Sequence, residues 1–177
     1  MENTEKMEET KKLILSCMAK VLKENGFPTE FFEGKDGNPP LTRIEMRSQG
    51  KVKQDVIMEM CFVPMSMPRP NTMLFQLYAT VLVGMPEYNF PELKRAIFYC
   101  NDFCPVGQFG IFEQAGQVYM RHNVVLDLED DLEKIVTEIC DYYSLMLASI
   151  GRFIDALAQI ASGATNIELA RDMDLLP

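Results

Sequence analysis

The sequence has very little histidine and no surplus of basic charge. His122 is the single histidine, so Ser-His-Asp and Cys-His catalysis are excluded unless this residue serves. Lysine and arginine together number 17 against 26 aspartates and glutamates, which gives a net charge of −9. Nucleic acids and anionic membranes are bound by basic surfaces, so we expect neither as a partner. A simpler role of the acidic surface is to keep the protein soluble.

Long apolar runs and a disulfide framework are also missing. The longest apolar stretches, such as residues 81–85, fall far short of the roughly 18 residues that a membrane-spanning helix needs. Residues 1–12 are polar and acidic and lack the apolar core of a secretory signal. The five cysteines are odd in number and scattered, which favours reduced thiols over disulfides. We therefore expect a cytoplasmic protein.

The sequence contains no motif that indicates a particular catalytic or ligand-binding chemistry. A glycine-rich phosphate loop, a His-Glu-x-x-His zinc motif and a nucleophile elbow are all absent. Cys100 and Cys104 are four apart on a predicted helix, where they suit a pair of small buried thiols better than a metal site. His122 is expected to be a hydrogen-bonded histidine of a sheet rather than a catalytic base. We therefore predict a protein that is not an enzyme and has no cofactor and no metal.

An acidic group precedes the last long helix. It consists of Glu129, Asp130, Asp131 and Glu133 and lacks the glycine and the spaced oxygen ligands of a calcium loop. Negative charge at the first turn of a helix is favoured by the helix dipole, which explains the group without a cation.

The order of the elements predicts an α+β fold. We expect a single domain over residues 1–163 and a tail over 164–177, within which a short helical turn would cover 167–173. Three helices and five strands follow one another as α-β-β-β-α-β-β-α, and the strands form an antiparallel sheet packed by the helices. The expected helices are 4–25, 90–103 and 127–163, and the expected strands are 41–47, 52–63, 72–83, 107–113 and 117–126. Residues 27–40 are expected to form a loop that Phe27, Phe31 and Phe32 pin onto the core.

The last helix carries an apolar stripe whose spacing alternates between four and three residues. The stripe comprises Leu132, Val136, Ile139, Tyr143, Met146, Ile150, Phe153, Leu157 and Ile160. Such a helix would be about 50 Å long, whereas a strand of six to eight residues spans only about 20–27 Å. Part of the stripe should therefore overhang the sheet and bind a second polypeptide, and we predict Tyr143, Met146, Ile150, Phe153 and Leu157 as the contacts. Gly151 predicts a kink or a close packing contact in this helix.

Methionine is the most distinctive residue type, with 13 in the chain. Its flexible thioether suits adaptable binding surfaces and also fills cores. Met58 and Met60 lie on a predicted strand, which favours the core. Met65 and Met67 lie in a proline-rich loop, where both the core and an exposed partner-binding role stay open.

The stretch from Phe98 to Asp127 resembles the YbjN-type family of bacterial proteins. The resemblance is carried by Asn101 at a helix end, Gly107 and Phe109 opening a strand, Gly116 in a turn, and Val118 and Arg121 in the next strand. The same succession of elements resembles the class I type III secretion chaperones, and the helix that begins near Leu128 fits both. The resemblance covers residues 90 to 160 well and residues 1 to 85 by the order of elements only.

The resemblance implies a type III secretion chaperone-like fold that is commonly dimeric, and YbjN-type proteins are often described as candidate regulators of sensory transduction. Together with the missing catalytic residues, it leads us to expect a non-enzymatic protein-binding module, chaperone-like or regulatory, that forms a homodimer and binds an unidentified protein. The alternative is a small-molecule sensor with an apolar ligand between the sheet and the long helix. The residues expected to line that site are Phe109, Phe112, Tyr119, Tyr143 and Met146.

Overall fold

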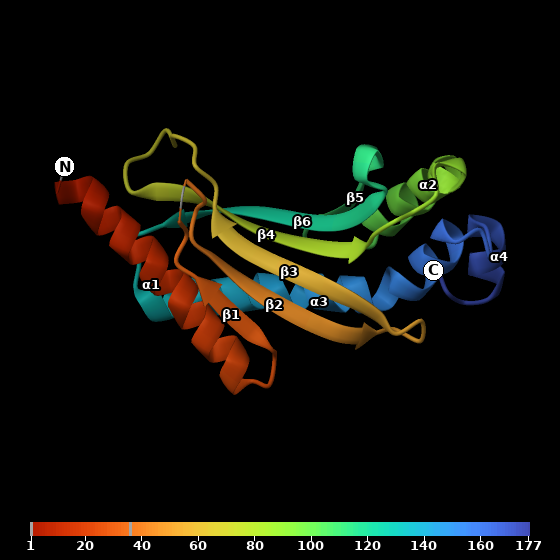
Figure 1. Ribbon diagram of the computed structural model, residues 1–177, viewed down its shortest axis with the longest axis horizontal. Helices are drawn as coiled ribbons and strands as arrows, with labels where there is room; N and C mark the ends of the chain where they lie inside the picture. Colours follow the sequence, from red (N-terminus) through yellow and green to blue (C-terminus); the bar gives the residue numbers. More distant parts are fainter. Residues whose placement is uncertain (1, 36) are drawn as a thin grey trace. The chain divides into compact units, whose positions relative to one another are not determined.

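The computed structural model describes residues 2–35 and 37–177 and has an α+β fold with an antiparallel sheet, as predicted (Figure 1). The sheet has six strands in the order β1-β2-β3-β4-β6-β5. The chain divides into two compact units, and each is described by itself. Unit 1 comprises Met1–Glu45, Met58–Tyr78 and His122–Tyr143, and unit 2 comprises Met46–Ile57, Ala79–Arg121 and Ser144–Pro177.

The elements follow the predicted order with one additional strand, and the short helical turn expected over 167–173 is present as a short helix. The strands are β1 (Thr29–Phe32), β2 (Leu41–Gln49), β3 (Gln54–Phe62), β4 (Thr72–Leu82), β5 (Gln108–Phe112) and β6 (Gln117–Asp127). The α-helices are α1 (Glu2–Glu24), α2 (Phe90–Asn101), α3 (Leu132–Ala161) and α4 (Ile167–Asp172), and two 3₁₀ turns are η1 (Glu87–Asn89) and η2 (Glu113–Ala115).

The prediction of a five-stranded sheet was wrong because β1 lies within the region expected to be a loop. Thr29–Phe32 pairs antiparallel with β2, and Phe31 lies opposite Thr42 while Phe32 lies opposite Leu41. Four residues are too few for the alternation of apolar and polar side chains to be seen in the sequence. Of the polar stretch that follows, residues 33–35 and 37–40 lie outside helices and strands, as predicted.

The core of unit 1 forms where α1 packs beside β1. The buried face of α1 carries Ile14, Leu15, Met18 and Leu22. The buried Thr42 hydroxyl donates a hydrogen bond of 2.7 Å to the carbonyl oxygen of Leu15, which satisfies a polar group that would be costly to bury alone. Met58 and Met60 are fully buried on β3, so they belong to the core as the sequence favoured.

In unit 2, α2 packs beside β5 through a pair of hydrogen bonds. The Asn101 side chain accepts a bond of 2.7 Å from the Phe109 N–H and donates one of 3.0 Å to the Phe109 carbonyl. The Phe109 ring meets the Phe153 ring edge to face at a centroid distance of 6.2 Å. Asn101 therefore joins the end of the helix to the start of the strand.

The long helix α3 begins later than predicted and is capped by a different residue. The Asp131 carboxylate accepts hydrogen bonds from the Glu133 N–H at 2.9 Å and the Lys134 N–H at 3.4 Å. Asp127, the predicted cap, accepts instead from the Glu129 N–H at 3.1 Å and closes the preceding turn. Both aspartates precede free backbone N–H groups, so the sequence alone did not decide between them.

The helix is continuous from Leu132 to Ala161, and the predicted overhang of its apolar stripe is absent. Tyr143, Met146, Ile150, Phe153 and Leu157 are all buried within the chain itself. The strands β4 and β6 have 11 residues each, so each spans about 36 Å beside a helix of about 45 Å. The prediction of an exposed stripe was wrong because it assumed strands that were too short.

Among the described residues, one helix has the length and apolar content to cross a membrane, and that helix is α3. Half of its most apolar stretch is buried inside the fold. The same combination occurs in the core helix of a soluble protein, so it is weak support for a membrane span.

The predicted kink or close contact at Gly151 is also absent, which makes this glycine a site for stabilisation. A Cβ atom built at Gly151 meets no heavy atom within 4 Å. We expect Gly151→Ala to raise the free energy of unfolding by about 0.5–1 kcal/mol, because alanine is the better helix former. Urea unfolding followed by circular dichroism measures the change.

Gly163→Ala is the matched control. Gly163 ends α3 with φ +76°, where the Gly163 N–H bonds to the Ile160 carbonyl and the Ala164 N–H to the Gln159 carbonyl. An alanine there is strained, so this variant should lose stability. A loss of stability in Gly151→Ala would contradict the open position of that residue.

Candidate functional site

The sequence-predicted partner contacts divide into a buried and an exposed group. The five helix residues are buried, as described above. Met65 is 49% exposed and Met67 is half-buried in the loop between β3 and β4. Only the two loop methionines are therefore available to a partner without a change in the fold.

The outward face of the sheet in unit 1 carries a run of uncharged side chains. Alternate residues of β4 point into the core, and the residues between them are half-buried. We name six outward residues of three neighbouring strands the uncharged strip: Cys61 on β3, Leu74, Gln76 and Tyr78 on β4, and Asn123 and Val125 on β6. The strip ends at charged outward residues of the same strands, Glu59 on β3 and Asp127 on β6. Sequence analysis missed this strip because it requires the strand order, which places β6 next to β4.

A hydrogen bond connects two strands within the uncharged strip, and the one thiol in the strip is neutral. The Gln76 amide donates a hydrogen bond of 2.9 Å to the Asn123 side-chain oxygen, which ties β4 to β6 across the outward face. Burial raises the pKa of the Cys61 thiol, and the charge of Glu59 raises it further. The thiol therefore stays neutral at physiological pH, and the strip carries no charge in a chain whose net charge is −9.

The strip is bordered on the β2 side by an ion pair. The Arg43 guanidinium binds one oxygen of Glu59 through Nη2 at 2.7 Å and Nε at 3.1 Å. The same guanidinium lies over the Phe32 ring, 5.2 Å from its centroid. Arg43 is thus fixed from two sides, and its charge is balanced by Glu59.

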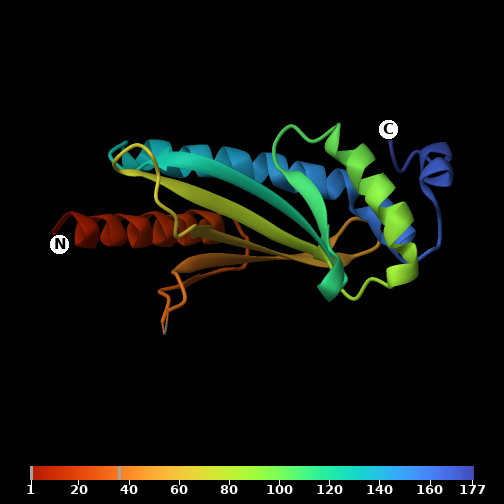
Figure 2. The same ribbon diagram turned by 90° about the horizontal axis from the view of Figure 1, so that it is seen from above.

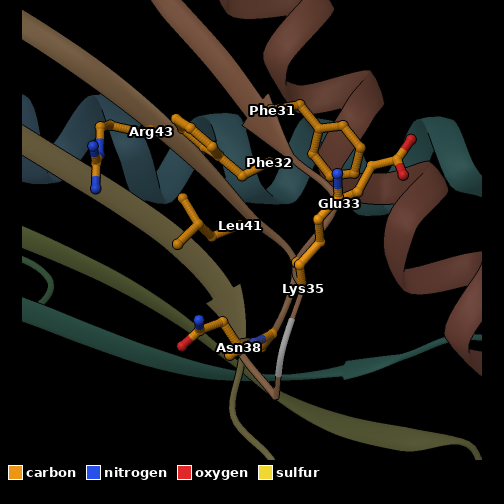
Figure 3. Close-up of a pocket in the computed structure, with 9 residues that line it drawn as sticks. Phe31, Phe32, Glu33, Lys35, Asn38, Leu41 and Arg43 are labelled. Atoms are coloured by element: carbon orange, nitrogen blue, oxygen red, sulfur yellow. The ribbon is translucent and has the colours of Figure 1, made fainter.

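A pocket of about 580 Å³ lies beside this ion pair in unit 1 (Figure 3). Its side chains come from β1, the loop after it and the start of β2, as Figure 3 shows. Apolar walls are formed by Phe31, Phe32, Pro39 and Leu41, and the polar lining comes from Glu33, Lys35, Asn38 and Arg43. The volume is in the range of pockets that bind small molecules or single side chains.

The loop that borders the pocket depends on one glycine. Gly34 has φ +78°, and a Cβ atom there would lie 2.5 Å from the carbonyl oxygen of Asn38. The Asn38 N–H in turn donates to the Lys35 carbonyl at 3.0 Å. Glycine is therefore required for the loop to fold back beside Leu41.

The two cysteines considered for a metal site are packed as thiols. The Cys104 thiol donates to the Cys100 carbonyl at 3.4 Å. Burial raises the pKa of Cys100 to about 12 and also raises that of Cys104. Neutral thiols are poor nucleophiles and poor metal ligands. Among the residues described, no three His, Cys, Asp or Glu side chains are grouped as a metal site.

The acidic residues before α3 make hydrogen bonds and an ion pair within the chain. Glu129 accepts a hydrogen bond of 2.7 Å from the Asn71 amide. Asp130 pairs with Lys134 at 2.9 Å, and Asp131 caps the helix. These contacts agree with the structural explanation given above.

His122 lies on the buried side of β6 and packs against an aromatic ring. Its ring centroid is 4.7 Å from that of Tyr142. The buried Nε2 atom has no hydrogen-bond partner among the described residues, so the expected hydrogen bond is absent at this nitrogen. Burial lowers the pKa of His122 below its usual value of 6.5.

The five residues proposed to line a ligand site between sheet and helix do not share one face. Phe109, Tyr143 and Met146 are buried, but Phe112 is half exposed. Tyr119 lies opposite Gly110 in the pairing of β5 with β6, while Phe109 lies opposite Met120. Since neighbouring strand residues point to opposite faces, Tyr119 and Phe112 lie on the other side of the sheet from Phe109. The location expected for a ligand was therefore wrong.

The lowered pKa of His122 predicts how stability depends on pH. The unfolded chain binds a proton near pH 6.5, whereas the folded chain binds it only at lower pH. The contribution of neutral His122 to the free energy of unfolding is thus complete above about pH 6.5 and is lost as the pH falls through the folded pKa. Urea unfolding between about pH 8 and pH 5 should show a larger loss for the wild type than for His122→Phe, which keeps a ring against Tyr142. Parallel curves for the two proteins would contradict a buried, neutral histidine.

Comparison with known proteins gives a likeness in structure and none in sequence. No model of a protein family matches the chain, and no curated protein matches it in sequence. The chain is similar to the crystal structure of YbjN from E. coli, which is described as a candidate transcription regulator. The two share 14% sequence identity with a TM-score of 0.45, and the match covers 82% of this chain and 92% of that one. This is the same type of protein that the sequence of residues 98–127 resembles.

Proposed function

We propose that the protein is a non-enzymatic protein-binding module of the cytoplasm, chaperone-like or regulatory, that acts as a homodimer. The observation that carries the proposal is the uncharged strip of unit 1. Outward residues of a sheet that faces only water are commonly charged. Here Leu74, Gln76 and Tyr78 on β4 and Asn123 and Val125 on β6 carry no charge.

The composition of the strip suits contact with a polypeptide. Interface cores are depleted in charge and combine aromatic and apolar area with a few hydrogen-bonding groups. Tyr78 supplies an aromatic ring, Leu74 and Val125 supply apolar area, and the Gln76–Asn123 pair supplies polar groups. Met65, exposed in the loop that leads into β4, adds a flexible apolar contact.

A second copy of the chain is the occupant that the charge pattern favours. Two copies with a net charge of −9 each repel one another unless their contact surfaces carry little charge. A two-fold interface brings each patch against the same patch of the partner. The uncharged strip meets this requirement, and the neighbouring Arg43 is already balanced by Glu59.

The homodimer is tested by placing a charge on the strip. Val125 is 42% exposed, so Val125→Glu should leave the fold intact while it puts like charges against each other in the dimer. We expect the wild type to be a dimer by light scattering coupled to size exclusion, and the variant to dissociate at least about tenfold more readily.

Val83→Glu is the control, because Val83 is also an exposed valine and lies outside the strip. It should remain dimeric. A wild type that stays monomeric at all accessible concentrations, with an intact fold by circular dichroism, would overturn the assignment of a second copy to the strip.

The second candidate function is a small-molecule sensor, and the pocket beside Arg43 favours it. Its volume and its Phe31, Phe32 and Leu41 walls fit an apolar or aromatic ligand. This location replaces the one between sheet and helix.

The sensor is tested with the fluorescent probe 1-anilinonaphthalene-8-sulfonate, which has both an aromatic and an anionic part. If the pocket binds such ligands, the wild type should enhance the fluorescence of the probe. Leu41→Glu should weaken binding at least about tenfold, because it places a charge in the apolar wall. Equal binding by the wild type and the variant would count against the pocket.

A further inference from the structure

The segment after α3, residues 164–177, is attached to α2 within unit 2 by a chain of ionic contacts. Glu92 of α2 accepts a hydrogen bond of 2.9 Å from the Ile167 N–H, the first residue of α4. The other oxygen of Glu92 binds Arg95 at 2.8 Å, and Arg95 binds Glu168 of α4 at 2.8 Å. Arg95 therefore bridges one carboxylate on each helix, and Figure 2 shows α2 and α4 side by side.

A second set of contacts gathers on Tyr99, two turns along α2 from Glu92. The Arg171 guanidinium lies 5.5 Å from the centroid of the Tyr99 ring. The Tyr99 hydroxyl donates a hydrogen bond to the carbonyl oxygen of Pro177. Both ends of the segment are thus held by half-buried polar groups of α2, and the ion pairs between them through Arg95 are exposed.

Apolar burial contributes little to this attachment. Of the 14 residues in the segment, Ile167, Ala170 and Leu176 are buried. Leu169 and Met173, four residues apart on α4, are more than half exposed. A segment with few buried apolar side chains and mainly exposed polar contacts belongs to the least stable parts of a fold.

The connection between α3 and the segment is held by half-buried or backbone hydrogen bonds, in contrast to the exposed ion pairs of the segment itself. The Asn89 amide donates a hydrogen bond of 2.9 Å to the Ala161 carbonyl at the end of the helix. The Ala164 N–H bonds back to the Gln159 carbonyl at 2.9 Å, and Gly163 takes the left-handed conformation that this helix end requires. Opening of the segment would therefore stop at Gly163 and leave α3 intact.

We infer that residues 164–177 form a strap that is released from α2 by ionic strength, independently of unfolding of the rest of the chain. Salt screens exposed charges, and the screening length falls from about 10 Å at 0.1 M to about 3 Å at 1 M. Arg95 is central to the strap because it joins a carboxylate on α2 to a carboxylate on α4. Release exposes the side of α2 that carries Glu92 and Tyr99, and this strap is a regulatory element separate from the uncharged strip.

Hydrogen exchange measured by mass spectrometry tests the strap in the full-length chain. Amides of residues 170–176 should exchange faster in about 1 M NaCl than in about 0.05 M NaCl, while those of α3 stay unchanged. Arg95→Gln should speed the exchange of the same amides roughly two- to thirtyfold at low salt, as expected from the loss of two surface ion pairs.

Lys94→Gln is the matched control, because Lys94 is the neighbouring cation of α2 and pairs with Glu113 at 2.9 Å instead of with the strap. It should leave the exchange of the strap unchanged. The inference is overturned if the wild-type strap exchanges at the same rate at both salt concentrations, or if it exchanges only together with α3. The salt series requires no variant, so a misfolded Arg95→Gln would not remove the test.

Discussion

Burial of one stripe of α3 is the constraint on which the rest of the structure depends. The helix presents apolar residues every three to four positions over 30 residues, and eleven of its side chains from Ile135 to Ala161 are apolar or aromatic and buried. Such a helix is stable only where a continuous apolar surface covers it. The strands meet this need with buried residues at every second position, as in β4 and β3. The opposite positions of the same strands are thereby left facing outward, and they include the uncharged strip.

Because the stripe of α3 is buried, the candidate binding surface lies on the sheet and not on the helix. The five helix residues that were expected to contact a partner are buried, so residues such as Tyr143 and Ile150 account for folding and are not available to a partner. The outward residues of β4 and β6 have no such task in folding. The lack of charge in the uncharged strip, in a chain whose net charge is −9, is the property that requires an explanation, and a second copy of the chain provides one.

The two proposed elements differ in the kind of force that holds them. The strip would bind through apolar area and a few amide groups, so its contacts should be insensitive to salt. The strap is held by Arg95 and by carboxylates that are open to solvent, so it should respond to salt strongly. A protein with both the strip and the strap can remain a dimer while the strap opens and closes.

The sequence by itself determined the order and type of the larger elements, because their periodicity is long enough to be read: α1, α2, α3 and the strands β2 to β6 all lie within about five residues of where the pattern predicted them. It also located the end of α3 near Gly163, but it left open whether Met65 is exposed. It did not determine β1, whose four residues are too few for a pattern, or the helix cap, where Asp127 and Asp131 are chemically equivalent. Only the tertiary structure decided which apolar residues are covered, because burial depends on strand length and strand order. The strip requires β6 to lie next to β4, and the contact between Arg95 and Glu168 joins residues 73 positions apart.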